Sequence, residues 1–295
     1  MKKRLFIIGI GGLTGSKLIE IAKDDFEIFG SYNYRNVESS IFKSIKLDIS
    51  NSSEIKNILE EIKPDVVINT AGINNVDYCE KFPNEASKIN IQAIKEICKI
   101  TKEIGIKFVQ LSSDSVFDGT KNLPYIETDD MKSINYYGKT KIESERIVLE
   151  NPNNCVVRAS VLYGYLSDDL AKIESSSKKS INFGQWLITK LILGEKVRII
   201  TDEYSSPIIA EDFARSIIHI IKNNQTGIFH SAPKLQITRY EFSVKIAKAL
   251  GLPIKLIEPV SNKELGRDVT TGSNKCLNSE KLSNILNYEF LTLDD

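Results

Sequence analysis

The chain has 295 residues, of which 41% are hydrophobic, and its 39 basic residues balance its 39 acidic ones. This length is enough to bury a large core, and the neutral charge excludes a global field that would recruit nucleic acid or an anionic membrane. Glycine breaks the first apolar run too early for a leader or a membrane span, so we expect a cytoplasmic protein. The sequence has two histidines, no CxxC pair and no carboxylate cluster with ligand spacing. We therefore predict that there is no metal site.

The first predicted elements are a strand, a glycine-rich turn and a helix. Residues 3–10 form a short apolar run with β-branched side chains, four glycines fall between Gly9 and Gly15, and residues 16–22 have helical spacing. Glycine allows close backbone approach, and the first turn of a helix presents free N–H groups to a pyrophosphate. The glycine spacing also occurs in ordinary tight turns, so its place between a strand and a helix is what favours a dinucleotide site.

The end of the second predicted strand bears on the choice of cofactor. It reads Gly30-Ser-Tyr-Asn-Tyr-Arg35, with no acidic residue before Glu38. Sites selective for NAD commonly place a carboxylate here, whereas Ser31 and Arg35 can bind a 2′-phosphate. We therefore predict NADPH, with NADH as the alternative; a solvated surface position for Arg35 is the competing interpretation.

Strands and helices alternate through the first half of the chain. This pattern predicts an α/β fold with a doubly wound parallel sheet. Ligands in such sheets bind beyond the carboxyl ends of the strands, where the glycine turn, Ala71-Gly72 and Ser112-Ser113 fall. The predicted strands are residues 26–30, 44–47, 66–68, 107–111 and 155–157, and the predicted helices include 53–62, 85–104, 183–193 and 240–250.

Tyr137 and Lys141 lie four residues apart in a predicted helix, so their side chains share one face. A cation beside a phenol favours the phenolate and lowers the phenol's pKa. Such a phenol can pass a proton to a reacting oxygen, provided that something else supplies the hydride. A Tyr–Lys pair on a solvated helix face is the alternative.

Taken together, Gly9-x-x-Gly12-x-x-Gly15, Asn69-Thr-Ala-Gly72, the run from Ser112 to Gly119 and Tyr137-x-x-x-Lys141 resemble the extended short-chain dehydrogenases/reductases. More narrowly, they resemble the dTDP-4-dehydrorhamnose reductases, and the resemblance covers almost the whole chain. It implies a Rossmann-type dinucleotide-binding domain over residues 1–160, to which 205–232 return. It also implies a smaller substrate-binding lobe from 161–204 and 233–295, and allows a homodimer.

The resemblance also implies residue roles. Tyr137 would donate a proton to a keto oxygen, Lys141 would lower the tyrosine's pKa and hold the nicotinamide ribose, and Ser113 would hydrogen-bond the same oxygen. The residues implied in cofactor binding are Gly9, Gly11, Gly12, Leu13, Thr14, Gly15, Ser31, Arg35, Asp48, Ile49, Ala71, Gly72, Tyr137 and Lys141. Those implied in substrate binding are Ser115, Asn182, Trp186 and Arg267.

Two departures from the family pattern concern the substrate. Ser115 stands where relatives usually have a tyrosine, and Gly266-Arg-Asp268 replaces an Arg-Pro pair. Trp186 can also be read as core packing, and residues 167–179 as either a lid or a solvated loop. The reaction type is therefore better supported than the substrate.

Three functions stay open. The leading one is NADPH-dependent reduction of the 4-keto group of a 4-keto-6-deoxy nucleotide sugar, above all dTDP-4-dehydrorhamnose to dTDP-rhamnose. The second is a cofactor-binding regulatory subunit that resembles the methionine adenosyltransferase β subunit. The third is a nucleotide-sugar epimerase or dehydratase, which is disfavoured because no Asp-Glu pair follows Ser113.

Overall fold

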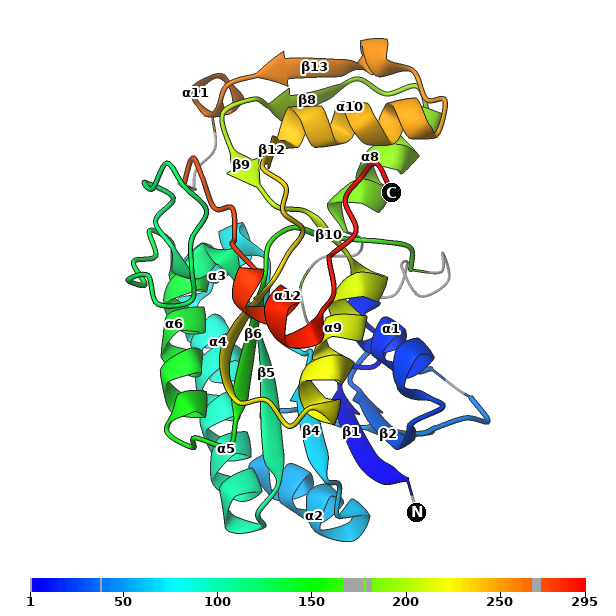
Figure 1. The fold of residues 1–295 in the computed structure, drawn as a ribbon, viewed down its shortest axis with the longest axis vertical. Coiled ribbons are helices and arrows are strands. Elements are labelled where there is room, and N and C mark those ends of the chain that lie inside the picture. Colours follow the sequence, from blue (N-terminus) through cyan, green and yellow to red (C-terminus); the bar gives the residue numbers. More distant parts are fainter. Residues whose placement is uncertain (1, 38, 167–177, 179–181, 267–271) are drawn as a thin grey trace.

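The computed structural model describes residues 2–37, 39–166, 178, 182–266 and 272–295. Its main feature is a seven-stranded parallel sheet in the order β11-β6-β5-β4-β1-β2-β3 (Figure 1). This arrangement confirms the predicted doubly wound sheet. The strands are β1 (Lys3–Ile8), β2 (Phe26–Tyr32), β3 (Lys43–Lys46), β4 (Val66–Asn69), β5 (Lys107–Ser113), β6 (Cys155–Ala159) and β11 (Gly227–Ser231).

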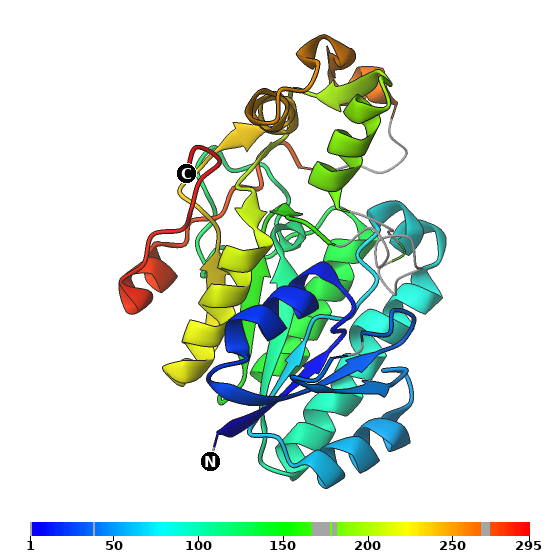
Figure 2. The same cartoon turned by 90° about the vertical axis from the view of Figure 1, so that its right-hand side faces the viewer.

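Helices cover both faces of this sheet (Figure 2). Successive side chains of a strand point to opposite faces, so Leu5 and Ile7 of β1 pack under α1 (Leu13–Ala22) and α9 (Ala210–Lys222). Phe6 and Ile8 pack instead under the helices of the other face, which are α2 (Ser52–Ile62), α5 (Ala93–Glu103) and α6 (Tyr136–Leu149). Because both faces are buried, the central strand β4 is almost continuously apolar, whereas the edge strand β3 is not.

The helix predicted over residues 85–104 is present, but a π-helical turn interrupts its α-helical pattern. It consists of α4 (Pro83–Ser87), a π-helical turn (Lys88–Gln92) and α5. The wider turn points Asn90 inward, where its amide accepts a hydrogen bond from Ile73 N at 2.9 Å and donates to Ile73 O at 2.8 Å and Thr140 Oγ1 at 3.1 Å. Asn90 thereby fixes the loop after β4 against α6. Helical periodicity gives no sign of this insertion.

A smaller lobe lies beyond the carboxyl ends of the large sheet (Figure 1). Its helices α8 (Phe183–Ile192) and α10 (Arg239–Ala249) pack on the parallel pair β8 (Val197–Ile200) and β13 (Ile257–Val260). Short elements complete the chain between and around the two parts. These are α3 (Val76–Lys81), η2 (Asp114–Val116), β7 (Leu162–Tyr163), β9 (Tyr204–Ser205), β10 (Ile208–Ile209), β12 (Ile237–Thr238), η3 (Ile254–Leu256), α11 (Asn262–Leu265) and α12 (Glu280–Leu286).

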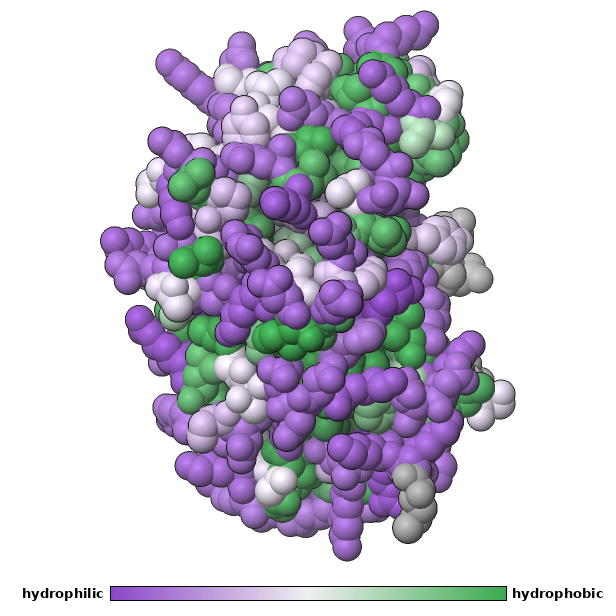
Figure 3. Space-filling view, viewed as in Figure 1, coloured by the Kyte–Doolittle hydropathy of each residue, from purple (hydrophilic) through white to green (hydrophobic). Residues whose placement is uncertain are grey.

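The C-terminal residues contact both the core of the large sheet and the smaller lobe. Leu282 of α12 and Phe290 are buried in the core under α1 and α9, whereas Asp294 forms an ion pair with Lys245 of α10. The proposed boundaries between the two domains therefore stay a prediction, as does a homodimer. Polar side chains cover most of the face shown in Figure 3. No helix in the described part of the chain is long and apolar enough to cross a bilayer.

Candidate active site

A cavity of about 810 Å³ opens at the carboxyl ends of the strands, between the large sheet and the smaller lobe. This volume is in the usual range for small-molecule sites. Its wall joins the glycine turn, the loop after β4, the end of β5 and the start of α6, as predicted. Thirteen of the predicted site residues line it: Gly9, Gly11, Gly12, Leu13, Thr14, Arg35, Ala71, Gly72, Ser113, Ser115, Tyr137, Asn182 and Trp186.

The glycine turn fits close approach of a dinucleotide. Gly9 has a φ of +90°, which favours glycine. A Cβ atom on Gly11 would lie 2.5 Å from the Arg35 carbonyl oxygen, and one on Gly15 would lie 2.3 Å from the Gly9 carbonyl oxygen. Since both neighbours are backbone atoms, they cannot turn aside. The glycines thus let the turn pack tightly, and Gly12, Leu13 and Thr14 at the N-terminus of α1 line the cavity, in the arrangement that binds a pyrophosphate.

The predicted cofactor contacts at the ends of β2 and β3 divide into two groups. Arg35 lines the cavity against the glycine turn, and burial lowers the pKa of its guanidinium. Ser31 is buried inside β2, where its carbonyl accepts hydrogen bonds from Gly9 N and Ile10 N, both at 2.9 Å. Asp48 is exposed and accepts a hydrogen bond from Ser50 N at 2.9 Å. Ser31, Asp48 and Ile49 do not form part of the cavity wall.

Tyr137 and Lys141 share the buried face of α6. The helix begins at Asn135, whose side chain accepts a hydrogen bond from Gly138 N at 2.9 Å. The Lys141 Nζ atom lies 5.9 Å from the centre of the Tyr137 ring and donates a hydrogen bond to Leu111 O at 3.1 Å. Ser113, at the end of β5, lines the cavity with Tyr137 and lies close enough to lower the pKa of the Tyr137 phenol. Ser113 and Tyr137 therefore meet at the cavity, whereas Lys141 lies on the next turn of α6 and is not part of the cavity wall.

Burial dominates the pKa of Tyr137 in this structure, and the lowering expected from Lys141 stays a prediction. Burial raises the pKa of Tyr137 above its usual value, and the charge of Asp114 adds to the rise, while the nearby Ser113 hydroxyl opposes it. Burial lowers the pKa of Lys141 to about 8, against the opposing charge of Glu145. Removal from water is the largest cause of the shift for both groups. Tyr137 therefore keeps its proton at neutral pH, as a proton donor requires.

Of the predicted substrate contacts, Ser115 lies in η2, whereas Asn182 and Trp186 come from α8 and its N-cap. Asn182 caps α8 by accepting a hydrogen bond from Gln185 N at 3.1 Å, and it donates one to Gly164 O at 2.8 Å. Trp186 lies one turn further along α8, with its ring 5.6 Å from that of Phe183, and lines the cavity. Arg267 and almost all of the predicted lid at 167–179 lie outside the described residues.

Comparison with known proteins places the chain in a family. The family model described as the RmlD substrate binding domain matches residues 3–292. The chain belongs to this family. It is thus an extended short-chain dehydrogenase/reductase of the RmlD type, as the motifs predicted.

Similar proteins carry different names. The probable low-salt glycan biosynthesis reductase Agl14 of Haloferax volcanii is 28% identical, over 98% of this chain and 94% of its own length. The methionine adenosyltransferase 2 subunit beta of Bos taurus is 29% identical, over 88% of this chain and 76% of its own. A hypothetical dTDP-4-dehydrorhamnose reductase from Sulfolobus tokodaii has a similar structure, with a TM-score of 0.85, 29% identity, and coverage of 99% of this chain and 98% of its own.

Several residues of this RmlD-family site escape sequence reasoning. Asp114 lines the cavity between the two predicted serines, and Arg239 and Lys275 bring positive charge to it from the smaller lobe. The Arg239 guanidinium lies 4.5 Å from the centre of the Phe183 ring. Asp114 stands inside the motif from Ser112 to Gly119, which could have revealed it. No sequence motif marks Arg239 or Lys275, because only the fold brings their segments to the cavity.

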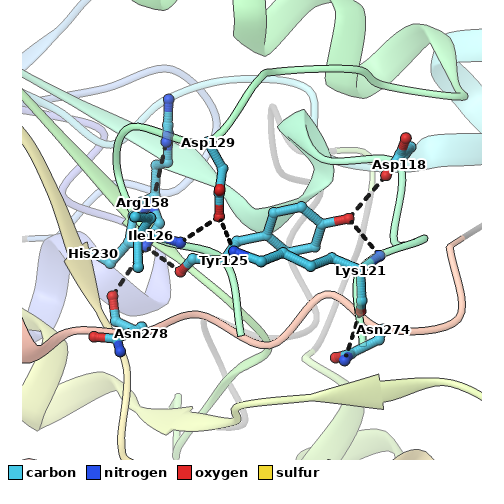
Figure 4. Close-up of polar contacts among 9 residues, drawn as sticks. All are labelled: Asp118, Lys121, Tyr125, Ile126, Asp129, Arg158, His230, Asn274 and Asn278. Carbon is cyan, nitrogen blue, oxygen red and sulfur yellow. Dashed lines mark hydrogen bonds and ion pairs between the residues drawn. The ribbon is translucent and has the colours of Figure 1, made fainter. Parts of the chain in front are cut away.

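Residues 118–131 and 274–278 form a clasp (Figure 4), and Lys275 lies in its second segment. Tyr125 exchanges backbone hydrogen bonds with this second segment, donating to Cys276 O and accepting from Asn278 N, both at 2.8 Å. The Asn274 amide donates to Lys121 O at 3.0 Å. The clasp therefore joins a loop of the large sheet to a segment that lines the cavity.

Lys141 gives a testable dependence on pH. The Lys141 side chain is a charged ammonium below its pKa of about 8 and a neutral amine above it. Cofactor binding that uses this charge is therefore expected to weaken as the pH rises through about 8. The dissociation constant of NADPH, measured by fluorescence from pH 7 to 9.5, checks this. The Lys141→Met variant serves as the control, since its binding is expected to be weaker and nearly independent of pH. A wild-type profile as flat as that of the variant would contradict the assignment.

Proposed function

We propose that this protein uses NADPH to reduce the 4-keto group of a 4-keto-6-deoxy nucleotide sugar, with dTDP-4-dehydrorhamnose as the first substrate to test. The observation that carries the proposal is a single cavity, which joins a glycine turn suited to a dinucleotide with Tyr137 and Ser113. The names of the similar proteins from Haloferax volcanii and Sulfolobus tokodaii, both reductases, support it.

The proposed reaction assigns one step to each of three side chains. NADPH, when bound, supplies a hydride to the keto carbon. Tyr137 donates its phenolic proton to the keto oxygen, and the Ser113 hydroxyl hydrogen-bonds the same oxygen. Once the proton has left, the ammonium of Lys141 on the next turn of the helix stabilises the phenolate. The raised pKa of Tyr137 suits this direction, since the group is protonated before the reaction.

A single assay tests the proposal. The purified protein is mixed with NADPH and a panel of 4-keto-6-deoxy nucleotide sugars, and the absorbance of the reduced nicotinamide is followed. Oxidation that depends on the sugar is the expected result. An altered sugar without net oxidation of the cofactor would indicate an epimerase or a dehydratase instead.

A regulatory subunit is the second candidate, favoured by the similarity to the methionine adenosyltransferase 2 subunit beta. The Tyr–Lys pair does not exclude it, because a cofactor-binding subunit can retain that pair. In this case no sugar would be reduced, and the protein would form a stable complex with a methionine adenosyltransferase catalytic subunit in size-exclusion chromatography.

Arg35 is expected to set the preference for NADPH. It lies on the cavity wall against the glycine turn, where a 2′-phosphate can reach its guanidinium. The Arg35→Gln change is expected to weaken NADPH binding by roughly ten- to one-hundred-fold, the size of a lost hydrogen bond to a charged group. Affinity for NADH, which has no 2′-phosphate, is the internal control and is expected to change little. Equal losses for both cofactors would contradict this role.

A further inference from the structure

A buried carboxylate lies beside the proposed catalytic trio. Asp114 is only 6% exposed, yet it lines the cavity. Its Oδ1 atom accepts hydrogen bonds from the hydroxyls of Ser113 at 3.0 Å and Ser115 at 3.3 Å. Its Oδ2 atom accepts one from the Ser160 hydroxyl at 2.8 Å. Neutral hydroxyl groups therefore supply all of these hydrogen bonds.

These three bonds leave the carboxylate able to accept another. An ionised carboxylate offers about four lone-pair sites, and Oδ2 has a single one of these donors. A buried charge gains most from hydrogen bonds, and a missing one is costly. Because Asp114 forms part of the cavity wall, a bound ligand can supply the fourth donor.

Asp114 also controls the hydroxyl proton of Ser113. That proton is directed to Asp114 Oδ1, while the Ser113 oxygen accepts a hydrogen bond from Ser115 N at 3.2 Å. In this state Ser113 cannot also donate to a keto oxygen. When a ligand hydroxyl donates to Asp114, the carboxylate no longer depends on Ser113, whose hydroxyl can then turn its proton toward the reacting oxygen.

We propose that Asp114 is a specificity-determining residue that accepts a hydrogen bond from the hydroxyl on the carbon next to the ketone. This inference rests on the proposed function. In a 4-keto-6-deoxy sugar that group is the C3 hydroxyl, because C5 carries the methyl group and the ring oxygen. Neighbouring oxygens of a sugar ring lie about one hydrogen-bond length apart, so a ketone held by Ser113 and Tyr137 places this hydroxyl beside Asp114.

The test compares a 4-keto-6-deoxy nucleotide sugar with its 3-deoxy analogue. For the wild type, kcat/KM is expected to be roughly ten- to one-hundred-fold lower with the analogue, as for the loss of a hydrogen bond to a charged group. In Asp114→Asn the acceptor is a neutral amide oxygen, so the preference is expected to fall to about two- to tenfold. Asp118→Asn, the same change in the same loop but away from the cavity wall, is the control and is expected to keep the wild-type preference.

Each outcome decides one proposal. If the wild type reduces both sugars equally well, the role of Asp114 is overturned. This comparison needs no variant, so the test does not depend on whether the Asp114→Asn protein folds. A full preference retained in a folded Asp114→Asn protein, with unchanged NADPH affinity, overturns it as well. If the wild type oxidises NADPH with neither sugar, the proposed function itself fails, and the inference fails with it.

Discussion

Replacement of Tyr137 by phenylalanine is expected to lower kcat by about 10²- to 10⁴-fold, the usual contribution of a positioned general acid. The change removes only the hydroxyl group, so the buried ring keeps its place on α6 beside Ile73, Cys79 and Ala86. NADPH affinity is therefore expected to stay within about threefold of the wild type, less than the loss of one charged hydrogen bond would cause. Initial rates with the best sugar of the panel and a fluorescence titration of NADPH measure the two quantities.

Tyr136→Phe provides a matched control for this prediction. Tyr136 is the adjacent residue on α6 and also packs near Ile73, but it does not line the cavity. The same atom is removed, so a general effect of losing a tyrosine hydroxyl from this helix would appear in both variants. Turnover by Tyr137→Phe that matches the Tyr136→Phe rate would rule out the proton-donor role.

The largest expected effect on stability comes from Arg158, which is fully buried in β6. Its guanidinium forms two hydrogen bonds with the Glu145 carboxylate, at 3.0 and 2.7 Å, and a third contact with His230 Nε2 at 3.1 Å. Burial, together with the charge of Arg158, lowers the pKa of His230 to about 3, so the imidazole is neutral and Nε2 accepts the hydrogen bond. Arg158→Met would leave the Glu145 charge buried without its partner. We expect a loss of about 3–5 kcal/mol in the free energy of unfolding, measured in urea.

Two further variants separate charge from packing. The double change Glu145→Met with Arg158→Met removes both charges and is expected to recover most of the lost stability, since an apolar pair of similar volume is often neutral or stabilising. Arg146→Met removes the neighbouring, exposed arginine of α6, which pairs with Glu143 at 3.5 Å, and is expected to cost about 0–1 kcal/mol. If Arg158→Met unfolds at the same urea concentration as Arg146→Met, the buried pair does not make the expected contribution to the free energy of unfolding.

The position of this pair links stability to the site. Tyr137, Lys141 and Glu145 are spaced by four residues, so they follow one another along the same face of α6. Glu145 also opposes the fall in the pKa of Lys141. The pairing of Glu145 with β6 therefore fixes the turn of the helix that follows the proposed catalytic residues.

Local patterns were enough to predict the sheet and much of the cavity wall. Strand and helix periodicity depend on neighbouring residues, and the requirement for glycine at Gly9 is a property of its own backbone. The same reasoning predicted the helix around Asn90 but not its π-helical turn. There, the inserted residue is fixed by hydrogen bonds to Ile73 and Thr140, which are distant in sequence.

By itself, the sequence determined the α/β architecture, the glycine turn and the meeting of Tyr137 and Ser113, because parallel strands bring their carboxyl ends to one edge. Only the tertiary structure decided how these groups titrate and what surrounds them. Burial, which sums contacts from many segments, raises the pKa of Tyr137 where a nearby cation alone would lower it. In the same way, the role proposed for Asp114 depends on the fold. Ser160, which follows a different strand, donates a hydrogen bond to the Asp114 carboxylate only because the fold brings the two residues together.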